Sequence, residues 1–225
     1  MTREELLGWI GVLLGLPGVL ILFLGGHIAV AALVLVLVAA FVWFAWRFNK
    51  PTFTILEVHK ILNFVSPDGA SATLVRTQKA RANHPASEFW FRGMGSDGRI
   101  ENIRIDGAAP ARILRELGEI HACKQYAHPL RSGTVSIVRL EYELLDSFPA
   151  AQESLLHTVF EPTGQLRLEV HFHSGRPCRS ARLFRRYGGG ERTLDIVDRS
   201  EDGVLASAIV KHPKVGSQYE LEWEW

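Results

Sequence analysis

The sequence predicts a membrane α-hairpin of two transmembrane helices, followed by a mainly antiparallel all-β domain, a β-sandwich or barrel, with one short helix. The chain has 225 residues, and a run of 41 of them, residues 6–46, contains no Asp, Glu, Lys, Arg, Asn, Gln, Ser or Thr. After Pro51, short segments alternate apolar and polar side chains, which is typical of strands with one buried face. Glycine-rich turn signals separate these segments. The expected domains are therefore a two-helix hairpin over residues 1–50 and a β-rich domain over residues 51–225.

The apolar run is long enough for two membrane spans. A hydrocarbon core of ~30 Å needs about 20 helical residues, and residues 6–24 and 28–46 supply 19 each. Gly25 and Gly26 lie between them, where a helix can end and the chain can reverse. Two alternatives stay open at this point: a cleaved signal peptide, and a re-entrant hairpin bent at Pro17.

The charges and aromatic residues that flank the run predict its orientation. Arg3 precedes the first span, and Arg47 and Lys50 follow the second, whereas the turn between them has no Lys or Arg. Positive flanks favour the cytoplasmic side of a membrane, and Trp9 and Trp43 suit the same interface. We therefore expect a multi-pass protein of the inner (plasma) membrane with both termini in the cytoplasm.

The first expected span carries a stripe of glycines on one side. Small residues at this spacing let a second helix approach closely in a lipid bilayer. The partner is either the alanine-rich second span or another copy of the chain, and the second choice predicts a homo-oligomer formed through the membrane helices. The helix-packing residues are Gly8, Gly11, Gly15 and Gly18.

The β domain is expected to contain five strand pairs and one helix near residues 110–121, where Ile113, Leu114, Leu117 and Ile120 share a helical face. The final strand places a row of glutamates on one face, which we expect to pair with Arg182 and Arg185. The expected pairs are 53–65 with 70–79, 87–92 with 99–105, 155–161 with 165–173, 179–187 with 191–198, and 203–211 with 218–225.

Four residues are candidates for ligand binding. His171 and His173 lie two apart on a strand and so point to the same face, where they either share a ligand or form ordinary surface pairs. Arg176 and Arg179 lie in a turn, and guanidinium groups suit phosphate recognition. A biased base composition of the genome explains 19 arginines against 6 lysines equally well. The histidines lack the further ligands of a closed metal site, so no metal is expected.

The sequence holds no catalytic constellation that we can name, and it predicts neither an enzyme nor a cofactor. Residues 93–98 match the GxGxxG pattern of dinucleotide-binding proteins, but a strand rather than a helix is expected after them. Cys123 and Cys178 are expected to be free thiols. Residues 51–225 carry no net charge, which argues against DNA or RNA as a partner.

The layout of two membrane spans, with the GxxxG pair Gly11 and Gly15, followed by a β domain resembles one known family. This family is the bacterial 2TM, β-strand-rich effectors of nucleotidyltransferase-associated anti-phage signalling systems. The resemblance implies that a small barrel senses a cyclic oligonucleotide and that the helices then assemble and damage the inner membrane. No residue of a family ligand site can be carried over to this chain.

Together these observations predict a membrane-anchored effector of antiviral defence, whose β domain senses a signal such as a nucleotide second messenger. Its helices would then oligomerise and disrupt the bilayer. The alternative is a non-enzymatic membrane anchor or adaptor whose β domain binds a protein partner, for example by strand addition at the final strand.

Overall fold

A computed structural model describes residues 32–41, 43 and 51–225 of the chain. The chain divides between Lys50 and Pro51 into two units, and each is described by itself. Of the first unit, residues 32–41 and 43 are helical. The glycine stripe predicted at Gly8, Gly11, Gly15 and Gly18 lies outside the described residues.

The structure contradicts the predicted membrane hairpin. A helix that crosses a bilayer needs about 20 consecutive, mostly apolar residues. Over the residues that the structure describes, no helix combines the length and the apolar character that a membrane crossing requires. The fold class is thus corrected from a transmembrane hairpin with a β domain to a β domain accompanied by a short described helix.

The predictions that depended on the hairpin fall with it. The location as a multi-pass protein of the inner membrane required two spanning helices, and the described part of the chain contains none. The effector mechanism required the same helices to oligomerise, and the membrane-anchor alternative required them to hold the β domain at the bilayer. All three predictions are therefore wrong on this structure.

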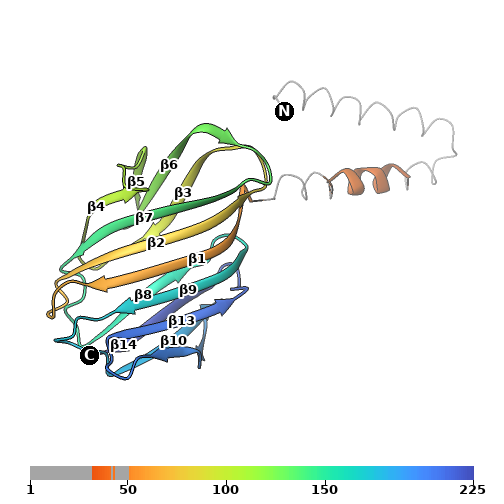
Figure 1. Ribbon diagram of the computed structural model, residues 1–225. Helices are drawn as coiled ribbons and strands as arrows, with labels where there is room; N and C mark the ends of the chain where they lie inside the picture. Colours follow the sequence, from red (N-terminus) through yellow and green to blue (C-terminus); the bar gives the residue numbers. More distant parts are fainter. Residues whose placement is uncertain (1–31, 42, 44–50) are drawn as a thin grey trace. The chain divides into compact units, whose positions relative to one another are not determined.

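The β domain contains fourteen described strands in three sheets (Figure 1). The largest sheet has the order β12 (Val197–Arg199), β13 (Leu205–Lys211), β9 (Thr163–His171), β1 (Phe53–Phe64), β2 (Ser71–Ala82), β7 (Val135–Leu145) and β4 (Arg99–Ile105). A four-stranded sheet has the order β11 (Gly190–Leu194), β10 (Ser180–Tyr187), β14 (Gln218–Glu224) and β8 (Gln152–Thr158). A three-stranded sheet has the order β3 (Ala86–Met94), β6 (Glu119–Leu130) and β5 (Arg112–Glu116).

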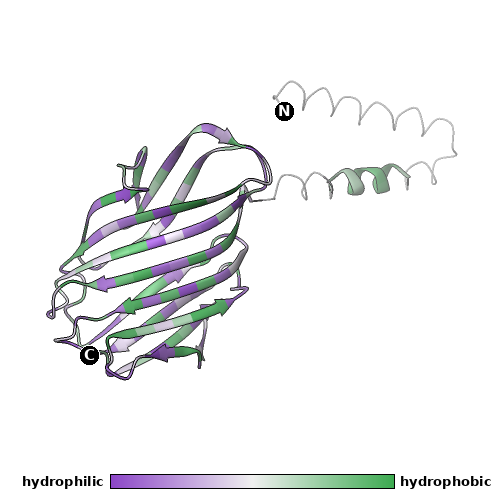
Figure 2. Cartoon of the chain, viewed as in Figure 1, coloured by the Kyte–Doolittle hydropathy of each residue, from purple (hydrophilic) through white to green (hydrophobic). Residues whose placement is uncertain are grey.

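The two small sheets lie side by side behind the large one, so the domain has two layers (Figure 1). All neighbouring strands are antiparallel except β1 and β9, which run parallel. Side chains alternate between apolar and polar along the strands (Figure 2), as expected where one face of each sheet is buried. The predicted mainly antiparallel β domain agrees with this architecture, and of the two forms predicted it is a sandwich.

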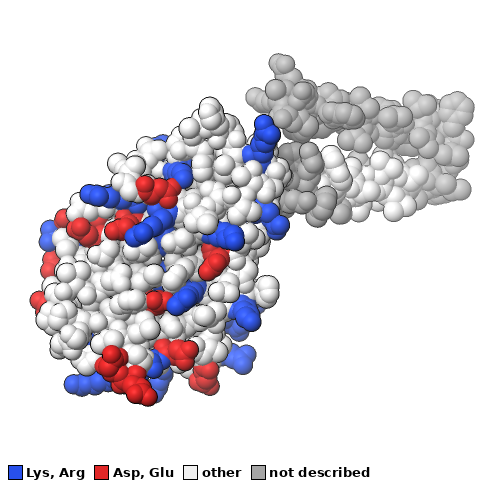
Figure 3. Space-filling view, in the orientation of Figure 1, with Lys and Arg blue, Asp and Glu red and all other residues white. Residues whose placement is uncertain are grey.

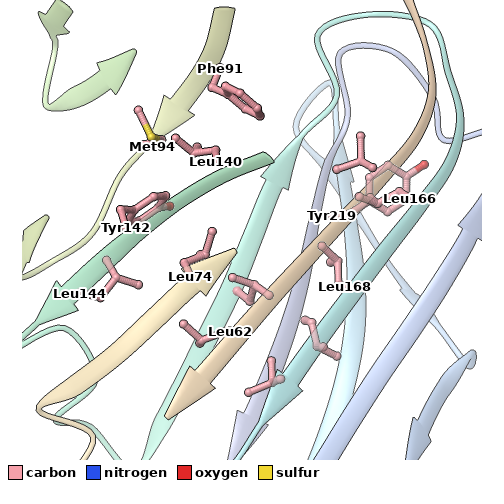
Figure 4. Packing of buried hydrophobic residues seen from close by; sticks show 14 of the residues in the cluster. Leu62, Leu74, Phe91, Met94, Leu140, Tyr142, Leu144, Leu166, Leu168 and Tyr219 are labelled. Carbon is pink, nitrogen blue, oxygen red and sulfur yellow. The ribbon is translucent and has the colours of Figure 1, made fainter. Parts of the chain in front are cut away.

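Apolar side chains from all three sheets fill the space between the layers. Figure 4 shows Phe91 and Met94 beside Leu140 and Tyr142 in one half, and Tyr219 beside Leu166 in the other. The core also contains a cluster of aromatic side chains, whose ring centroids lie 4.6–6.0 Å apart. Its members are Phe64, Phe148, Phe172, Trp223 and Trp225.

The strand pairs were predicted correctly in two of five cases. β1 pairs with β2 and β10 pairs with β11, as expected. In the other three cases the two strands go to different partners: β3 pairs with β6, β4 with β7, β8 with β14, and β9 with β1 and β13. The helix expected over residues 110–121 is wrong as well, because β5 and the start of β6 form a hairpin there. β14 lies between β10 and β8, so the final strand has no free edge for strand addition.

Candidate functional site

Two buried cationic side chains interrupt the apolar inner face of the large sheet. Lys60 on β1 and Arg76 on β2 are direct cross-strand neighbours, and their exposed fractions are 8% and 7%. Most of the other inward-facing residues of β1 and β2 are apolar, for example Leu62 and Leu74, although Gln78 beside Arg76 is buried and polar. In the described part of the chain, no carboxylate lies within 4.0 Å of either side chain to form an ion pair. The charge of Glu161 acts on Arg76 from beyond that distance, but a buried pair of like charges without a direct ion pair is still costly.

Part of the explanation for this burial lies at the seam between the two small sheets, which is formed by the edge strands β8 and β3. β8 and β3 are edge strands of their sheets, so some of their backbone carbonyls lack a strand partner. Lys60 Nζ donates to the carbonyl oxygen of Leu156 on β8 at 2.6 Å, and Arg76 Nη1 donates to that of Arg92 on β3 at 3.0 Å. The two cations therefore hold both small sheets against the large one where the second layer is divided.

Burial and the neighbouring charge change the protonation of this cluster. Burial first, and then the charge of Arg76, lower the pKa of Lys60 from 10.5 to about 7. Burial lowers the pKa of Arg76 to about 10, which still leaves its guanidinium charged at neutral pH. His157 on β8 is buried nearby, and burial together with the charges of Arg76 and Lys60 keeps its pKa well below the usual value. Near pH 7, Lys60 is thus divided between the amine and the ammonium form.

Lys60 also lines a pocket of about 340 Å³ that opens at this seam. Leu74, Leu144 and Leu155 line it beside Lys60 and are buried, as are Ser147 and Phe148, so these residues form its inner part. Besides Lys60 and the three leucines, the lining residues come from the end of β3 and the loop after it, the start of β6, the segment after β7, and β8: Gly93, Gly95, Ser96, Asp97, Glu119, Ser147, Phe148, Glu153, Ser154, Leu156 and Thr158. A second hollow of about 460 Å³ lies near Arg182 and Asp195, with no buried ionisable group among its lining residues.

Three carboxylates gather towards the solvent end of the Lys60 pocket. Asp97 and Glu119 are exposed and Glu153 is half-buried. The pKa of Glu153 is raised, first by burial and also by the charge of Asp97, although a hydrogen bond from the Ala150 amide at 2.6 Å and the positive charge of Arg176 oppose the rise. A carboxylate beside a second negative charge favours a positive group nearby. The pocket therefore joins an acidic mouth to an amine at its inner end.

The loop between β3 and β4 forms one wall of this pocket and is held in place by hydrogen bonds. Ser96 Oγ donates to Ser147 Oγ at 2.6 Å and accepts from the Gly98 amide at 3.2 Å. A Cβ atom at Gly98 would lie only 2.1 Å from the carbonyl oxygen of Leu145, so this close approach requires glycine. The GxGxxG match thus belongs to a loop that crosses from one sheet to another, with strand β4 and not a helix after it.

The predicted ligand residues lie elsewhere and have partners within the protein. Arg176 stacks on the ring of Trp225 at 3.8 Å and donates to the carbonyl oxygens of Asp68 and Ala150 at 2.9 and 3.1 Å. The amide of Arg179, an exposed residue, donates to the carbonyl oxygen of Glu224 at 2.7 Å. Ligand binding by either arginine stays a prediction, but these contacts show what each residue does in the fold.

The two predicted ligand histidines have different partners in the fold. His171 Nε2 lies 2.5 Å from Glu169 Oε1, whereas His173 Nδ1 accepts from the amide of Gly175 at 3.0 Å. In the residues described, no group of three or more His, Cys, Asp or Glu side chains is arranged to hold a metal ion. Cys123 and Cys178 are both buried and free.

Sequence reasoning missed Lys60 and Arg76, although a signal was present. In β1 the inward positions run Val58, Lys60, Leu62 and Phe64, and in β2 Arg76 lies between inward-facing Leu74 and Gln78. A charged residue at the apolar phase of an otherwise alternating strand marks a buried ionisable group. Only the fold shows that the two positions meet and that a pocket reaches one of them.

Comparisons with known proteins give fold similarity alone. No family model matches the chain, and no curated protein matches it. Among solved structures, an M1 zinc metallopeptidase from Deinococcus radiodurans matches with 13% identity and a TM-score of 0.42, over 76% of this chain and 42% of that one. Yeast LTA4 hydrolase in complex with bestatin matches with 13% identity and a TM-score of 0.44, over 76% of this chain and 28% of that one. A protein described as nutrient-binding, from Legionella pneumophila, matches with 8% identity and a TM-score of 0.47, over 78% and 68%.

The chain spans less than half the length of both enzymes. All three TM-scores are below 0.5, so the similarity assigns no activity to this chain. Two of the three structures are enzymes by name, and the expectation that this chain is not an enzyme stays a prediction. The resemblance to the 2TM effectors also stays a prediction, since no family or curated match bears on it.

Proposed function

We propose that the β domain is a binding module for small organic cations that carry a carbonyl, carboxyl or hydroxyl group. The observation that supports this is the pocket at the seam, in which the carboxylates of Asp97, Glu119 and Glu153 surround the mouth and Lys60 lies at the inner end. Concave sites with a few convergent polar groups are the usual places for small ligands, and ionisable groups with shifted pKa values mark them.

The charges of the pocket favour one orientation of the ligand. A positive group at the mouth adds to the charge of Arg176 in offsetting the repulsion between Glu153 and Asp97. An oxygen at the other end of the ligand meets the Lys60 amine, which has protons to donate. The domain as a whole does not attract cations, because residues 51–225 carry no net charge and positive and negative side chains intermingle on the face that Figure 3 shows. Selectivity therefore comes from the pocket and not from the overall charge.

The proposal concerns binding and assigns no turnover to the chain. It also differs from a nucleotide sensor, because a phosphate would meet the carboxylates at the mouth before it reached Lys60. A cyclic oligonucleotide is therefore a poor fit to this pocket, although its binding elsewhere on the domain stays a prediction.

The test compares choline with 3,3-dimethyl-1-butanol, in which an uncharged carbon replaces the quaternary nitrogen. Ligand-observed NMR with the full chain should detect choline binding and at least tenfold weaker binding of the neutral alcohol. The double variant Asp97→Asn, Glu153→Gln should remove the difference between the two ligands. Equal binding of both ligands, or no binding of choline at millimolar concentration, would overturn the proposal.

A steric block provides a second test. Gly95 lines the pocket, and a Cβ atom added there has no other atom within 4 Å. Gly95→Trp should therefore fold normally and abolish choline binding by filling the mouth. Gly190→Trp is the matched control, because Gly190 lies on the surface β10–β11 hairpin and its nearest neighbour is 3.5 Å from an added Cβ. Choline binding that survives Gly95→Trp would place the ligand elsewhere.

A further inference from the structure

We propose that Lys60 is a nucleophilic amine that forms an imine with small aldehydes entering the seam pocket, and that it prefers aldehydes bearing a positive charge. This inference rests on the proposed function, because it concerns the same pocket and adds the chemical class of ligand that reacts there. It goes further in giving Lys60 a covalent role.

The geometry favours the neutral form of the Lys60 side chain. It is buried between two layers, it lies directly opposite Arg76, and in the described residues it has no carboxylate within ion-pair distance. An amine is a nucleophile only when it is unprotonated, and lysines that act in this way are commonly placed in apolar surroundings or next to a second cation. Lys60 has both features, and the lowered pKa of about 7 agrees with them.

Lys60 also borders the pocket that a ligand would enter. Lys60 is one of the residues that line the pocket, whereas Arg76 is not. Its one hydrogen bond in the structure goes to the carbonyl oxygen of Leu156 at 2.6 Å. A neutral amine that donates to an acceptor keeps its lone pair free for attack on a carbonyl carbon. Arg76 therefore acts as a positioning residue that disfavours the ammonium form, and Lys60 as the group that reacts.

The reaction balances without any further reagent. The Lys60 nitrogen attacks the carbonyl carbon, and the carbonyl electron pair moves onto the oxygen, which takes up a proton to give a carbinolamine. The nitrogen has by then passed one of its two protons to the oxygen, so loss of the hydroxyl group with the one proton that remains on the nitrogen releases one water and leaves the C=N bond. Addition of water reverses these steps, so binding of the aldehyde is reversible.

The carboxylates at the mouth supply the charge preference. A cationic aldehyde can place its positive group near Asp97 and Glu153 while its carbonyl carbon lies at the inner end of the pocket. An anionic aldehyde such as glyoxylate meets the same carboxylates as a barrier. The preferred ligands are thus short aldehydes with a positively charged end.

The test traps the imine on the full chain with sodium cyanoborohydride at pH 7 and locates the label by peptide mapping with mass spectrometry. The probes are betaine aldehyde and its neutral isostere 3,3-dimethylbutanal. An ordinary lysine amine with a pKa of about 10.4 is neutral in only about one molecule in 2,500 at this pH. We expect Lys60 to be labelled at least tenfold faster than Lys79, Lys211 and Lys214, which are exposed and serve as references in the same sample.

Variants separate a site-specific reaction from general amine chemistry. Betaine aldehyde should label Lys60 at least fivefold faster than 3,3-dimethylbutanal, and the variant Asp97→Asn, Glu153→Gln should remove that preference. Lys60→Arg keeps a donor for the Leu156 carbonyl and should lose the fast label while the reference lysines keep theirs. Arg76→Gln should slow labelling at pH 7 and restore it at higher pH, which a purely structural role would not do.

The outcomes distinguish this inference from the function on which it rests. Labelling of Lys60 no faster than that of the three reference lysines would overturn the imine proposal. If choline still binds in that case, the cation-binding function stands and only the covalent step fails. If neither choline nor the aldehyde engages the pocket, both proposals fail together.

Discussion

Lys60 and Arg76 lie directly opposite each other on β1 and β2, and both side chains are buried between the layers of the sandwich. Like charges at such positions destabilise a sheet. Each side chain offsets this cost by a hydrogen bond to a carbonyl on the edge strand above it, Lys60 to Leu156 and Arg76 to Arg92. The pair thus joins the large sheet to both small sheets and leaves one of its members at the wall of a pocket.

The lowered pKa of Lys60 should make the stability of the domain depend on pH. The folded protein releases the Lys60 proton near pH 7, whereas the unfolded chain keeps it until about pH 10.5. Between these values the unfolded state binds more protons, so the free energy of unfolding should rise with pH by up to about 1.4 kcal/mol per unit. Well below pH 7, Lys60 is protonated in both the folded and the unfolded state, so it adds no pH dependence to the free energy of unfolding there.

Urea unfolding at pH 7, 8 and 9 can measure this contribution as the difference between the original protein and Lys60→Met. The variant should lack the slope that Lys60 supplies. Lys79→Met is the matched control, because Lys79 lies exposed on β2. An identical pH dependence in the original protein and Lys60→Met would contradict the buried-amine description.

The existence of strands was predictable from the sequence, but their partners were not. Turn residues at 93–98 show that the chain changes direction, and they do not show whether the next strand stays in the same sheet. Here the loop carries the chain from β3 in the three-stranded sheet to β4 in the large one, because Gly98 packs against the Leu145 backbone. Long-range pairing of this kind depends on the packing of layers, which local alternation does not encode.

The helix predicted over residues 110–121 is a second case in which a local pattern was misleading. Ile113, Leu114 and Leu117 have helical spacing, yet Leu117 and Gly118 form the tip of the β5–β6 hairpin with φ angles of 50° and 82°. Gly118 was the local signal against a helix. Of the two arginines expected to face the glutamates of the final strand, Arg182 lies opposite Glu222, whereas Arg185 lies opposite Tyr219. Glu220 pairs instead with Arg186 at 2.7 Å.

Arg176 should contribute measurably to stability, whatever it binds. Its guanidinium stacks on Trp225 and donates to the carbonyl oxygens of Asp68 and Ala150, so it ties three separate segments together. Arg176→Ala should lower the free energy of unfolding by about 2 kcal/mol, from the lost stacking and two charge-assisted hydrogen bonds. Arg179→Ala removes an exposed arginine nearby and should change it by less than about 0.5 kcal/mol. Denaturant unfolding of the Arg176→Ala and Arg179→Ala variants compares the two effects. Equal losses of stability would show that the contacts of Arg176 with Trp225, Asp68 and Ala150 contribute nothing.

Glu169 should make the domain sensitive to acid. Burial works to raise its pKa, but hydrogen bonds with His171 and His59 and the charge of Arg167 outweigh burial and lower it. Because the folded pKa lies below the unfolded value, this stabilisation is present above about pH 4.5 and is lost as pH falls through the folded pKa. Glu169→Gln should therefore be less stable than the original protein at pH 7, by about 1–2 kcal/mol, and should lose less stability on acidification. Thermal unfolding at pH 7 and pH 4 measures both effects, and parallel losses in the two proteins would contradict the assignment.

Leu117 occupies a conformation that suits asparagine better. Its φ of 50° is in the left-handed region, its side chain is fully exposed at 106%, and Gly118 follows it at the tip of a two-residue hairpin. Left-handed backbone costs a branched apolar residue about 1–2 kcal/mol, whereas Asn-Gly is the preferred pair for this type of turn. Leu117→Asn should therefore stabilise the domain by about 1 kcal/mol in urea unfolding. Leu114→Asn, at an exposed position within β5, provides the control and should not stabilise, because asparagine is disfavoured in strands. A loss of stability in Leu117→Asn would mean that the leucine has a packing partner in solution.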